Sequence, residues 1–261
     1  MAKNIINKVE IIAEIGVNHN GNISLAKKSN LAAKKCGAET VKFQTFNVDN
    51  FVLKGTQKTL YQKKNTKKNE DHYEMIKKLE LTKENFAELK KFSEKKKLNF
   101  LSTPYDTQSV DFLENIGVKR YKTASADLYD LNLHERIIET GKPVIISVGM
   151  SSLKDVKITL DLYKKKKYKN VSILHCVSNY PCSLESLNLN CIKLLKEEFN
   201  YNVGFSDHSM GFLASTVAVS LGAKIIEKHF TLNNNMIGPD HKTSLNPKNF
   251  SEFVKLVKNT Q

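Results

Sequence analysis

Two histidines stand at the ends of two successive apolar segments, and imidazole is a common ligand of divalent metals. His208 ends the segment 202–208 (NVGFSDH), and His229 lies near the end of the segment 224–230 (KIIEKHF). If these segments are adjacent parallel strands, about 4.8 Å apart, the two rings can converge on one point. Two histidines with positions left for water and substrate would form a catalytic metal site. The spacing alone leaves open that both rings only bond loop carbonyls, because no HxxxH pattern is present.

Other polar side chains recur in the second halves of the apolar segments. Those that could bind a ligand are Glu14, Lys42, Gln44, Thr103, Lys122, Ser125, Ser147 and Ser206. Burying a polar group without a partner costs about 1–3 kcal/mol of folding free energy. A polar ligand that binds where these side chains gather therefore explains them best. Two lysines with hydroxyl groups suit a phosphate or a carboxylate. No GxxxxGK[ST] or GxGxxG motif is present, which argues against a nucleotide.

Eight segments rich in β-branched and aromatic residues must position these side chains. They span residues 11–16, 40–46, 99–105, 120–125, 143–150, 171–177, 202–208 and 224–230. Helical patterns lie between or after them, at about 24–38, 82–97, 107–116, 132–140, 152–166, 185–199, 211–221 and 247–258. This alternation predicts an α/β fold, a (β/α)8 TIM barrel that occupies residues 1–261 as one domain. A doubly wound open sheet is the alternative.

Local signals set some of the expected boundaries. Ser24 is the expected N-cap of the first helix, and Gly37 stands where a C-terminal glycine belongs. Thr82 stands near the start of the next long helix. The polar stretch 47–81 interrupts the even spacing, and a loop of this length is either a functional lid or disordered.

Composition limits the class of protein. The net charge is +14, but the lysines come in blocks at 63–68, 95–97 and 164–167 with few aromatic residues among them. This pattern favours solvated helix ends, with steering of an anionic substrate as the alternative, and we expect no nucleic-acid partner. The four cysteines form no CxxC pair, and neither a membrane span nor a signal peptide is predicted, so a cytoplasmic location is expected.

Nine motifs in order resemble those of the N-acetylneuraminate (sialic acid) synthase family, which includes legionaminic and pseudaminic acid synthases. They are AEIGVNHNGN, GAETVKFQTF, LSTPYD, YKTASAD, GKPVIISVGM, LHCVSNYP, GFSDHSMG, EKHFTL and GPDHKTSLNP. The resemblance covers about residues 10–258 and implies a (β/α)8 catalytic barrel. It implies an enzyme that condenses phosphoenolpyruvate with an N-acylated mannosamine-type sugar, forms a nine-carbon 2-keto acid and releases phosphate. The motif GPDHKTSL leans toward the sialic or legionaminic branch.

The resemblance also implies roles for residues that match the family's motifs. His208 and His229 would bind a divalent metal, most often Mn²⁺, with Mg²⁺ or Co²⁺ as alternatives. Glu14 would lie beside the metal and the reacting carbons. Phosphoenolpyruvate would contact Lys42, Thr103, Lys122, Ser125, Ser147 and Ser206, and the sugar would lie near Gln44, Tyr180 and Asp240.

Two departures from the family's pattern bear on these expectations. Family members continue into a small antifreeze-like domain that reaches across a dimer, and this chain stops at Gln261, after the eighth barrel helix. Three possibilities therefore stay open: the chain forms a homodimer, it is a fragment, or it is a barrel that binds ligand without turnover. Val177 replaces a threonine that is common in relatives. A related synthase that acts on a phosphorylated aldose is the other enzymatic alternative.

Overall fold

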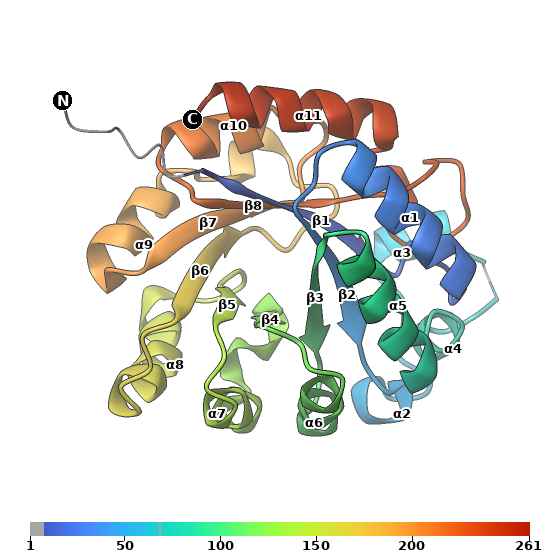
Figure 1. Ribbon diagram of the computed structural model, residues 1–261, viewed down its shortest axis with the longest axis horizontal. Coiled ribbons are helices and arrows are strands. Elements are labelled where there is room, and N and C mark those ends of the chain that lie inside the picture. The colour runs from blue at the N-terminus through green and yellow to red at the C-terminus, as the bar shows by residue number, and fades with distance from the viewer. Residues whose placement is uncertain (1–7, 68) are drawn as a thin grey trace.

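Eight parallel strands form a nearly closed barrel, as predicted (Figure 1). The computed structural model describes residues 8–67 and 69–261. The strands are β1 (Glu10–Gly16), β2 (Thr40–Thr45), β3 (Asn99–Pro104), β4 (Tyr121–Thr123), β5 (Val144–Ser147), β6 (Val171–Cys176), β7 (Asn202–Asp207) and β8 (Ile225–His229). Their hydrogen-bonded order is β3-β2-β1-β8-β7-β6-β5-β4. Strands β3 and β4, at the two ends of this order, contact each other.

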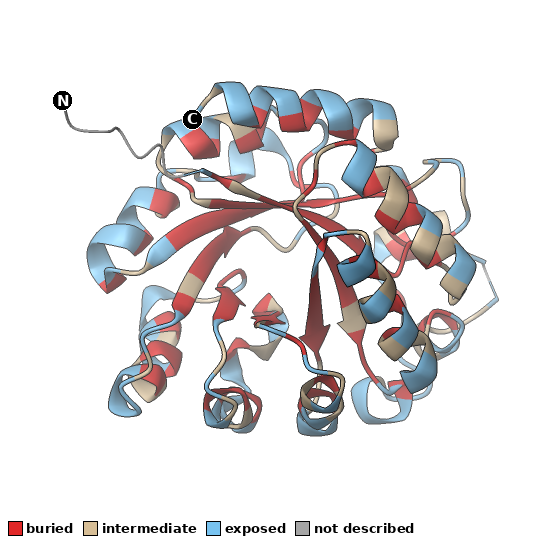
Figure 2. Cartoon of the chain, viewed as in Figure 1, coloured by how far each residue is buried: buried red, intermediate tan, exposed pale blue. Residues whose placement is uncertain are grey.

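Eight of the described helices surround the barrel (Figure 1). They are α1 (Ile23–Lys35), α5 (Lys83–Lys95), α6 (Thr107–Asn115), α7 (Leu131–Glu139), α8 (Leu153–Lys165), α9 (Cys191–Phe199), α10 (Leu213–Ser220) and α11 (Pro247–Asn259). The strands are buried along most of their length, and the helices turn buried faces toward them and exposed faces outward (Figure 2). The main core therefore lies between strands and helices, where alternate strand residues such as Ile11, Ala13 and Ile15 are fully buried.

The alternation along each strand places the other residues inside the barrel. A cluster of Ile12, Leu101, Ile145, Leu174 and Ile225 fills the interior near the beginnings of the strands. Two residues further along, Glu14 follows Ile12 on the same face of β1, and Glu227 follows Ile225 on the same face of β8. The barrel is thus apolar at its base and polar toward the carboxyl ends of its strands.

Two helix boundaries differ from the prediction. Helix α1 begins at Ile23, and its N-cap is Asn22, whose side chain accepts a hydrogen bond of 3.0 Å from the backbone nitrogen of Leu25. The prediction of Ser24 as N-cap is wrong because Asn22 already satisfies the first turn. The segment 185–199 is not one helix, since a 3-10 turn (Leu184–Ser186) precedes α9 and Asn188 has a positive φ of 45°.

The stretch 47–81 is folded in its described part. It forms α2 (Val48–Phe51), α3 (Leu60–Asn65) and α4 (His72–Lys77), and these pack at the carboxyl end of the barrel. A small core beneath them contains Val17, Phe46, Val48, Met75, Ile76 and Leu79. The stretch therefore contributes a wall to the mouth of the barrel.

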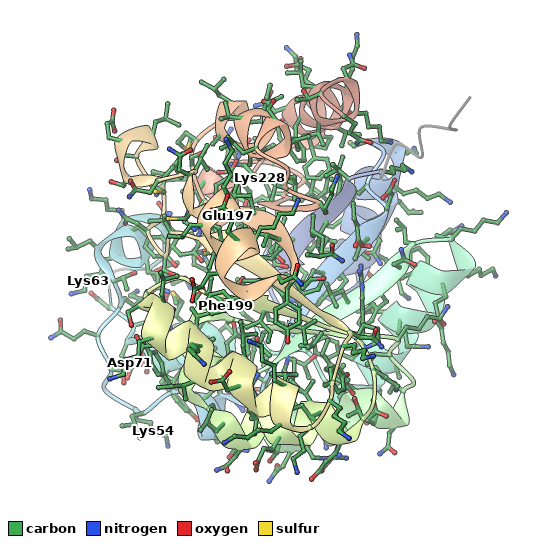
Figure 3. All side chains as sticks on the ribbon, turned by 90° about the vertical axis from the view of Figure 1, so that its left-hand side faces the viewer. Lys54, Lys63, Asp71, Glu197, Phe199 and Lys228 are labelled. Atoms are coloured by element: carbon green, nitrogen blue, oxygen red, sulfur yellow. The ribbon has the colours of Figure 1, made fainter. Side chains whose placement is uncertain are left out.

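The described lysines of the three blocks lie at or near the ends of helices, as expected from the sequence. Residues 95–97 and 164–167 close α5 and α8, and Lys63 and Lys64 belong to the last turn of α3. Lys54 and Lys63 lie at the outer margin of the molecule (Figure 3). Lys68 of the block 63–68 and residues 1–7, over which no signal peptide is predicted, lie outside the described residues. All four cysteines are free thiols, and none of the described helices is long and apolar enough to cross a bilayer.

Candidate active site

All the predicted site residues line one cavity at the carboxyl ends of the strands. Its volume is about 360 Å³. The predicted residues on its wall are Glu14, Lys42, Gln44, Thr103, Lys122, Ser125, Ser147, Tyr180, Ser206, His208, His229 and Asp240. Eight separate strands and their loops deliver these side chains, so barrel closure is what brings them together.

One side of the cavity is built by β1, β2 and β3. Glu14 pairs in register with Lys42, and the Nζ of Lys42 lies 3.0 Å from Oε2 of Glu14. The amide of Gln44 donates to Oε1 of Glu14 at 3.0 Å, and Lys42 also donates to the hydroxyl of Thr103 at 3.4 Å. Gly16 has a φ of +51°, and a Cβ there would come within 2.8 Å of Oε1 of Glu14, so the turn after β1 requires glycine.

The next part of the wall is built by β4 and β5, since β4 contacts β3. Lys122 donates to the hydroxyl of Ser147 at 2.6 Å and to the carbonyl of Thr123 at 3.0 Å. Ser125 follows β4, and its Oγ accepts a bond of 2.9 Å from the backbone nitrogen of Gly149. Two cationic side chains, Lys42 from β2 and Lys122 from β4, thus reach the same part of the cavity together with several hydroxyls, which suits an anionic ligand.

Glu227 joins these two sides and was not among the predicted site residues. Its Oε1 lies 3.6 Å from Nζ of Lys42 and 3.8 Å from Nζ of Lys122, and it accepts a 3.0 Å bond from Ser206. Its position two residues before His229, on the same strand face, is the sequence signal that could have identified it. Tyr61, Tyr105 and Cys176 also line the cavity without having been predicted.

His208 and His229 come together as the strand spacing suggests. Their ring centroids are 5.6 Å apart, and the ring of Tyr180 lies 4.1 Å from that of His208 and 5.8 Å from that of His229. An oxygen of Asp240 lies 3.9 Å from Nδ1 of His229. The imidazoles therefore share one region of the cavity with an aromatic ring and a carboxyl group.

The donor set at the two histidines fits a divalent metal. Nδ1 of His208 donates to the carbonyl of Val177 at 2.9 Å, so Nε2 is the ring nitrogen that a metal would bind in place of its proton. Nδ1 of His229 is buried and has no hydrogen-bond partner. Across residues 8–67 and 69–261 no three His, Cys, Asp or Glu side chains gather closely enough to hold a metal alone. A metal here would need oxygen ligands from water or substrate as well.

Burial and charge set the protonation of the central groups. Burial raises the pKa of Glu14, with the charge of Glu227 adding to this effect and Lys42 opposing it. Burial acts in the same direction on Glu227, but Lys122 and Lys42 outweigh it and bring the pKa of Glu227 down to about 2. Of the two carboxyl groups, Glu14 therefore takes up a proton more readily.

Burial and neighbouring charges also shift the pKa values of Lys42, His229 and Asp240. The pKa of Lys42 is raised, because Glu14 and Glu227 outweigh the burial that would lower it. Burial and the nearby charge of His208 lower the pKa of His229 well below its ordinary value, so this ring is neutral at pH 7. Burial and the charge of Glu14 raise the pKa of Asp240 to about 7.

The loop that carries Asp240 is held by the loop after β1. The amide of Asn18 donates to the carbonyl of Phe230 and to the hydroxyl of Ser244, both at 2.9 Å. Ser244 donates in turn to the backbone carbonyl of Asp240 at 2.6 Å. His241 bonds to Thr231 at 2.7 Å. The polar motif GVNHNG thus positions the residues 238–244 beside the histidines.

The comparisons with known proteins agree over nearly the whole chain. An uncharacterized protein of Methanocaldococcus jannaschii is 44% identical over 248 residues, which are 95% of this chain and 69% of that protein. The N,N'-diacetyllegionaminic acid synthase of Legionella pneumophila is 41% identical over 255 residues, 96% of this chain and 72% of that enzyme.

A solved structure and a family match complete the comparison. The crystal structure of the N-acetylneuraminic acid (sialic acid) synthetase of Leptospira borgpetersenii superposes with a TM-score of 0.86. It is 34% identical in sequence, and the match covers 97% of this chain and 84% of that one. Residues 31–261 match the NeuB family. The chain belongs to the NeuB family.

Proposed function

We propose that this enzyme condenses phosphoenolpyruvate with an N-acylated mannosamine-type sugar to a nine-carbon 2-keto acid and releases phosphate. The observation that carries the proposal is the convergence of Lys42 and Lys122 on one cavity that also holds His208 and His229. The volume of about 360 Å³ is in the range of small-molecule sites. The relatives named as legionaminic and sialic acid synthases support the sugar class.

The lysines and hydroxyls would hold the two anionic groups of phosphoenolpyruvate. Lys122 and Ser147 are already hydrogen-bonded, and Ser125 lies near them, so the wall formed by β4 and β5 offers one anion subsite. Lys42 and Thr103 offer a second subsite on the wall formed by β2 and β3. Ser206 on β7 donates to Glu227, which lies near both lysines. Charge-assisted hydrogen bonds of this kind fix orientation and stabilise developing charge.

In the proposed reaction, the C2–C3 π electrons of phosphoenolpyruvate form a bond from C3 to the aldehyde carbon of the open-chain sugar. The aldehyde C=O π bond breaks, and its oxygen takes up a proton to become a hydroxyl. A water adds at C2, and the bond from C2 to the phosphate oxygen then breaks with release of phosphate. Glu14 is the proposed general base for that water, because its raised pKa favours proton uptake and Gln44 and Lys42 fix its orientation. The lysines retain the carboxylate and the phosphate throughout.

His208 and His229 are the proposed ligands of a divalent metal, Mn²⁺ first, with Mg²⁺ or Co²⁺ as alternatives. The carbonyl of Val177 and the unpartnered Nδ1 of His229 support this assignment. A bound metal would supply Lewis-acid polarisation of the sugar's aldehyde oxygen. Gln44, Tyr180 and Asp240, on the wall near Glu14 and the histidines, are the proposed contacts of the sugar.

Measuring phosphate release over a panel of acceptors tests the proposal. The enzyme, with phosphoenolpyruvate and Mn²⁺, is given N-acetylmannosamine, diacetamido-hexoses, arabinose 5-phosphate or erythrose 4-phosphate, and products are identified by mass spectrometry. We expect phosphate and a nine-carbon acid only with N-acylated, unphosphorylated sugars. Turnover restricted to a phosphorylated aldose would instead establish the related keto-acid synthase. Calorimetric binding of phosphoenolpyruvate without product from any acceptor would establish a binding protein.

A further inference from the structure

The short helix α3 brings one aromatic side chain to the cavity from outside the barrel strands. Its capping box ties Thr59 to Gln62, and Asn65 donates a 2.8 Å hydrogen bond to the carbonyl of Pro239, next to Asp240. The buried Lys58 donates to Thr66 at 3.0 Å. The capping box and the bond of Lys58 stabilise α3 itself, and the bond of Asn65 holds it against the loop after β8, far away in the sequence.

Only one face of α3 is turned to the site. Tyr61 and Gln62 line the cavity, whereas Leu60 is 78% exposed and Lys63 lies at the outer margin of the molecule (Figure 3). The ring of Tyr61 stacks on that of Tyr180, with centroids 5.4 Å apart and an angle of 25° between planes. Tyr180 in turn lies against His208. Two parallel rings thus form a continuous aromatic wall that ends at the histidines.

The hydroxyl of Tyr61 has donor capacity left for a ligand. Its oxygen lies 3.5 Å from Nε2 of Gln62, which donates to it. Burial, and then the negative charge of Asp240, raise the pKa of Tyr61, so the phenol keeps its proton. A neutral hydroxyl on an apolar aromatic ring suits a polyol, which has an apolar face, better than it suits a phosphate.

We propose that Tyr61 is a sugar-binding residue that completes the acceptor pocket with Tyr180, an inference that rests on the proposed condensation. The anion subsites at Lys42 and Lys122 lie on barrel strands, whereas Tyr61 enters from α3 at the side where Tyr180 and Asp240 stand. The ring covers the apolar face of the sugar, and the hydroxyl donates to a sugar oxygen. Asn65 keeps the ring in place through its bond to Pro239.

Steady-state kinetics of the whole chain separate this role from a structural one. Tyr61→Ala should raise the KM for the sugar by about 30- to 100-fold, because the variant lacks both the ring and the hydrogen bond that bind the sugar. The KM for phosphoenolpyruvate should stay unchanged within about twofold, because Tyr61 does not contact this substrate in the proposal. Tyr61→Phe keeps the ring and should raise the sugar's KM only about three- to tenfold. Asn65→Ala should shift the same constant in the same direction.

Tyr129→Ala is the matched control, since this tyrosine is 57% exposed and lies outside the cavity. It should leave both Michaelis constants unchanged. If the wild-type chain turns over sugar and Tyr61→Ala leaves the sugar's KM within about twofold, or raises both constants equally, the assignment of Tyr61 is wrong while the proposed function stands. A wild-type chain without turnover on any acceptor would overturn both.

Discussion

Lys42 and Glu14 form an ion pair that is almost completely shielded from solvent. Their side chains are 5% and 2% exposed, and Nζ of Lys42 lies 3.0 Å from Oε2 of Glu14. Adjacent parallel strands hold the two residues in register, so the pair is rigid before any substrate arrives. Such an arrangement keeps the cation charged and leaves the carboxyl group with a raised pKa.

The first prediction concerns the carboxyl group of this pair. Glu14→Gln should lower kcat by about 10²- to 10⁴-fold, the range of a lost general base, and leave the KM for phosphoenolpyruvate unchanged or lower. Lys42 keeps its charge in this variant because Glu227 is 3.6 Å away. Glu80→Gln, which alters a partly exposed carboxylate bonded to Lys77, is the control. An unchanged kcat with a higher KM would show that Glu14 only orients Lys42.

The second prediction concerns the carboxylate shared by the two lysines. Glu227→Gln removes the negative charge that lies within 4 Å of both Lys42 and Lys122, so the free energy of unfolding should fall by about 3–5 kcal/mol. Ser206→Ala removes only the hydrogen bond to Glu227 and should cost about 1 kcal/mol. Phosphoenolpyruvate should raise the melting temperature more in Glu227→Gln than in wild type, because the ligand replaces the missing anion. Equal ligand-induced shifts would contradict this role.

The third prediction tests the metal directly. Chelation should abolish phosphate release, and Mn²⁺ should restore it in wild type but not in His208→Ala or His229→Ala. Electron paramagnetic resonance of free Mn²⁺ gives a second measurement, since both variants should lose binding even without turnover. His175→Gln is the control, because His175 bonds to the carbonyl of Leu187 away from the cavity. Full recovery of phosphate release by His208→Ala when Mn²⁺ is added back would refute the assignment of the ligands.

The barrel and the polar face could be predicted because both follow from local patterns. Each apolar segment became a strand, and alternation along it placed Lys42 and Gln44 on the wall of the cavity. Alternation with His229 also places Glu227 on this wall, but its contacts with Lys42 and Lys122 could not be predicted, since these lysines stand on β2 and β4, which are not neighbours of β8. Only closure of the barrel brings these three side chains together.

The residues 47–81 show the other limit of prediction. Their polar composition carries no strand or long-helix pattern, so the stacking of Tyr61 on Tyr180 depends on tertiary contacts such as the bond from Asn65 to Pro239.

The pair of Asp207 and Lys228 was missed for a similar reason. These residues lie 3.0 Å apart and fully buried among the helices outside the barrel, where sequence alternation predicts only apolar side chains.

The fourth prediction concerns pH and a histidine remote from the cavity. His134 on α7 is fully buried, and its Nδ1 is 2.8 Å from the hydroxyl of Tyr163. Burial lowers the pKa of His134 from 6.5 to about 4. Between these values the unfolded chain binds a proton that the folded chain does not, so stability must fall as the pH decreases from 6.5 toward 4.

This histidine should account for on the order of 3 kcal/mol of the free energy of unfolding lost over that range. Substitution by glutamine removes the titration. The difference in stability between wild type and His134→Gln, measured by urea unfolding at each pH, should therefore be constant above pH 7 and shrink steadily toward pH 4. His19 and His241 also have pKa values near 4, but they titrate in both proteins and cancel in this difference. A difference that stays the same at every pH would mean that His134 is protonated in the folded chain as readily as in the unfolded one.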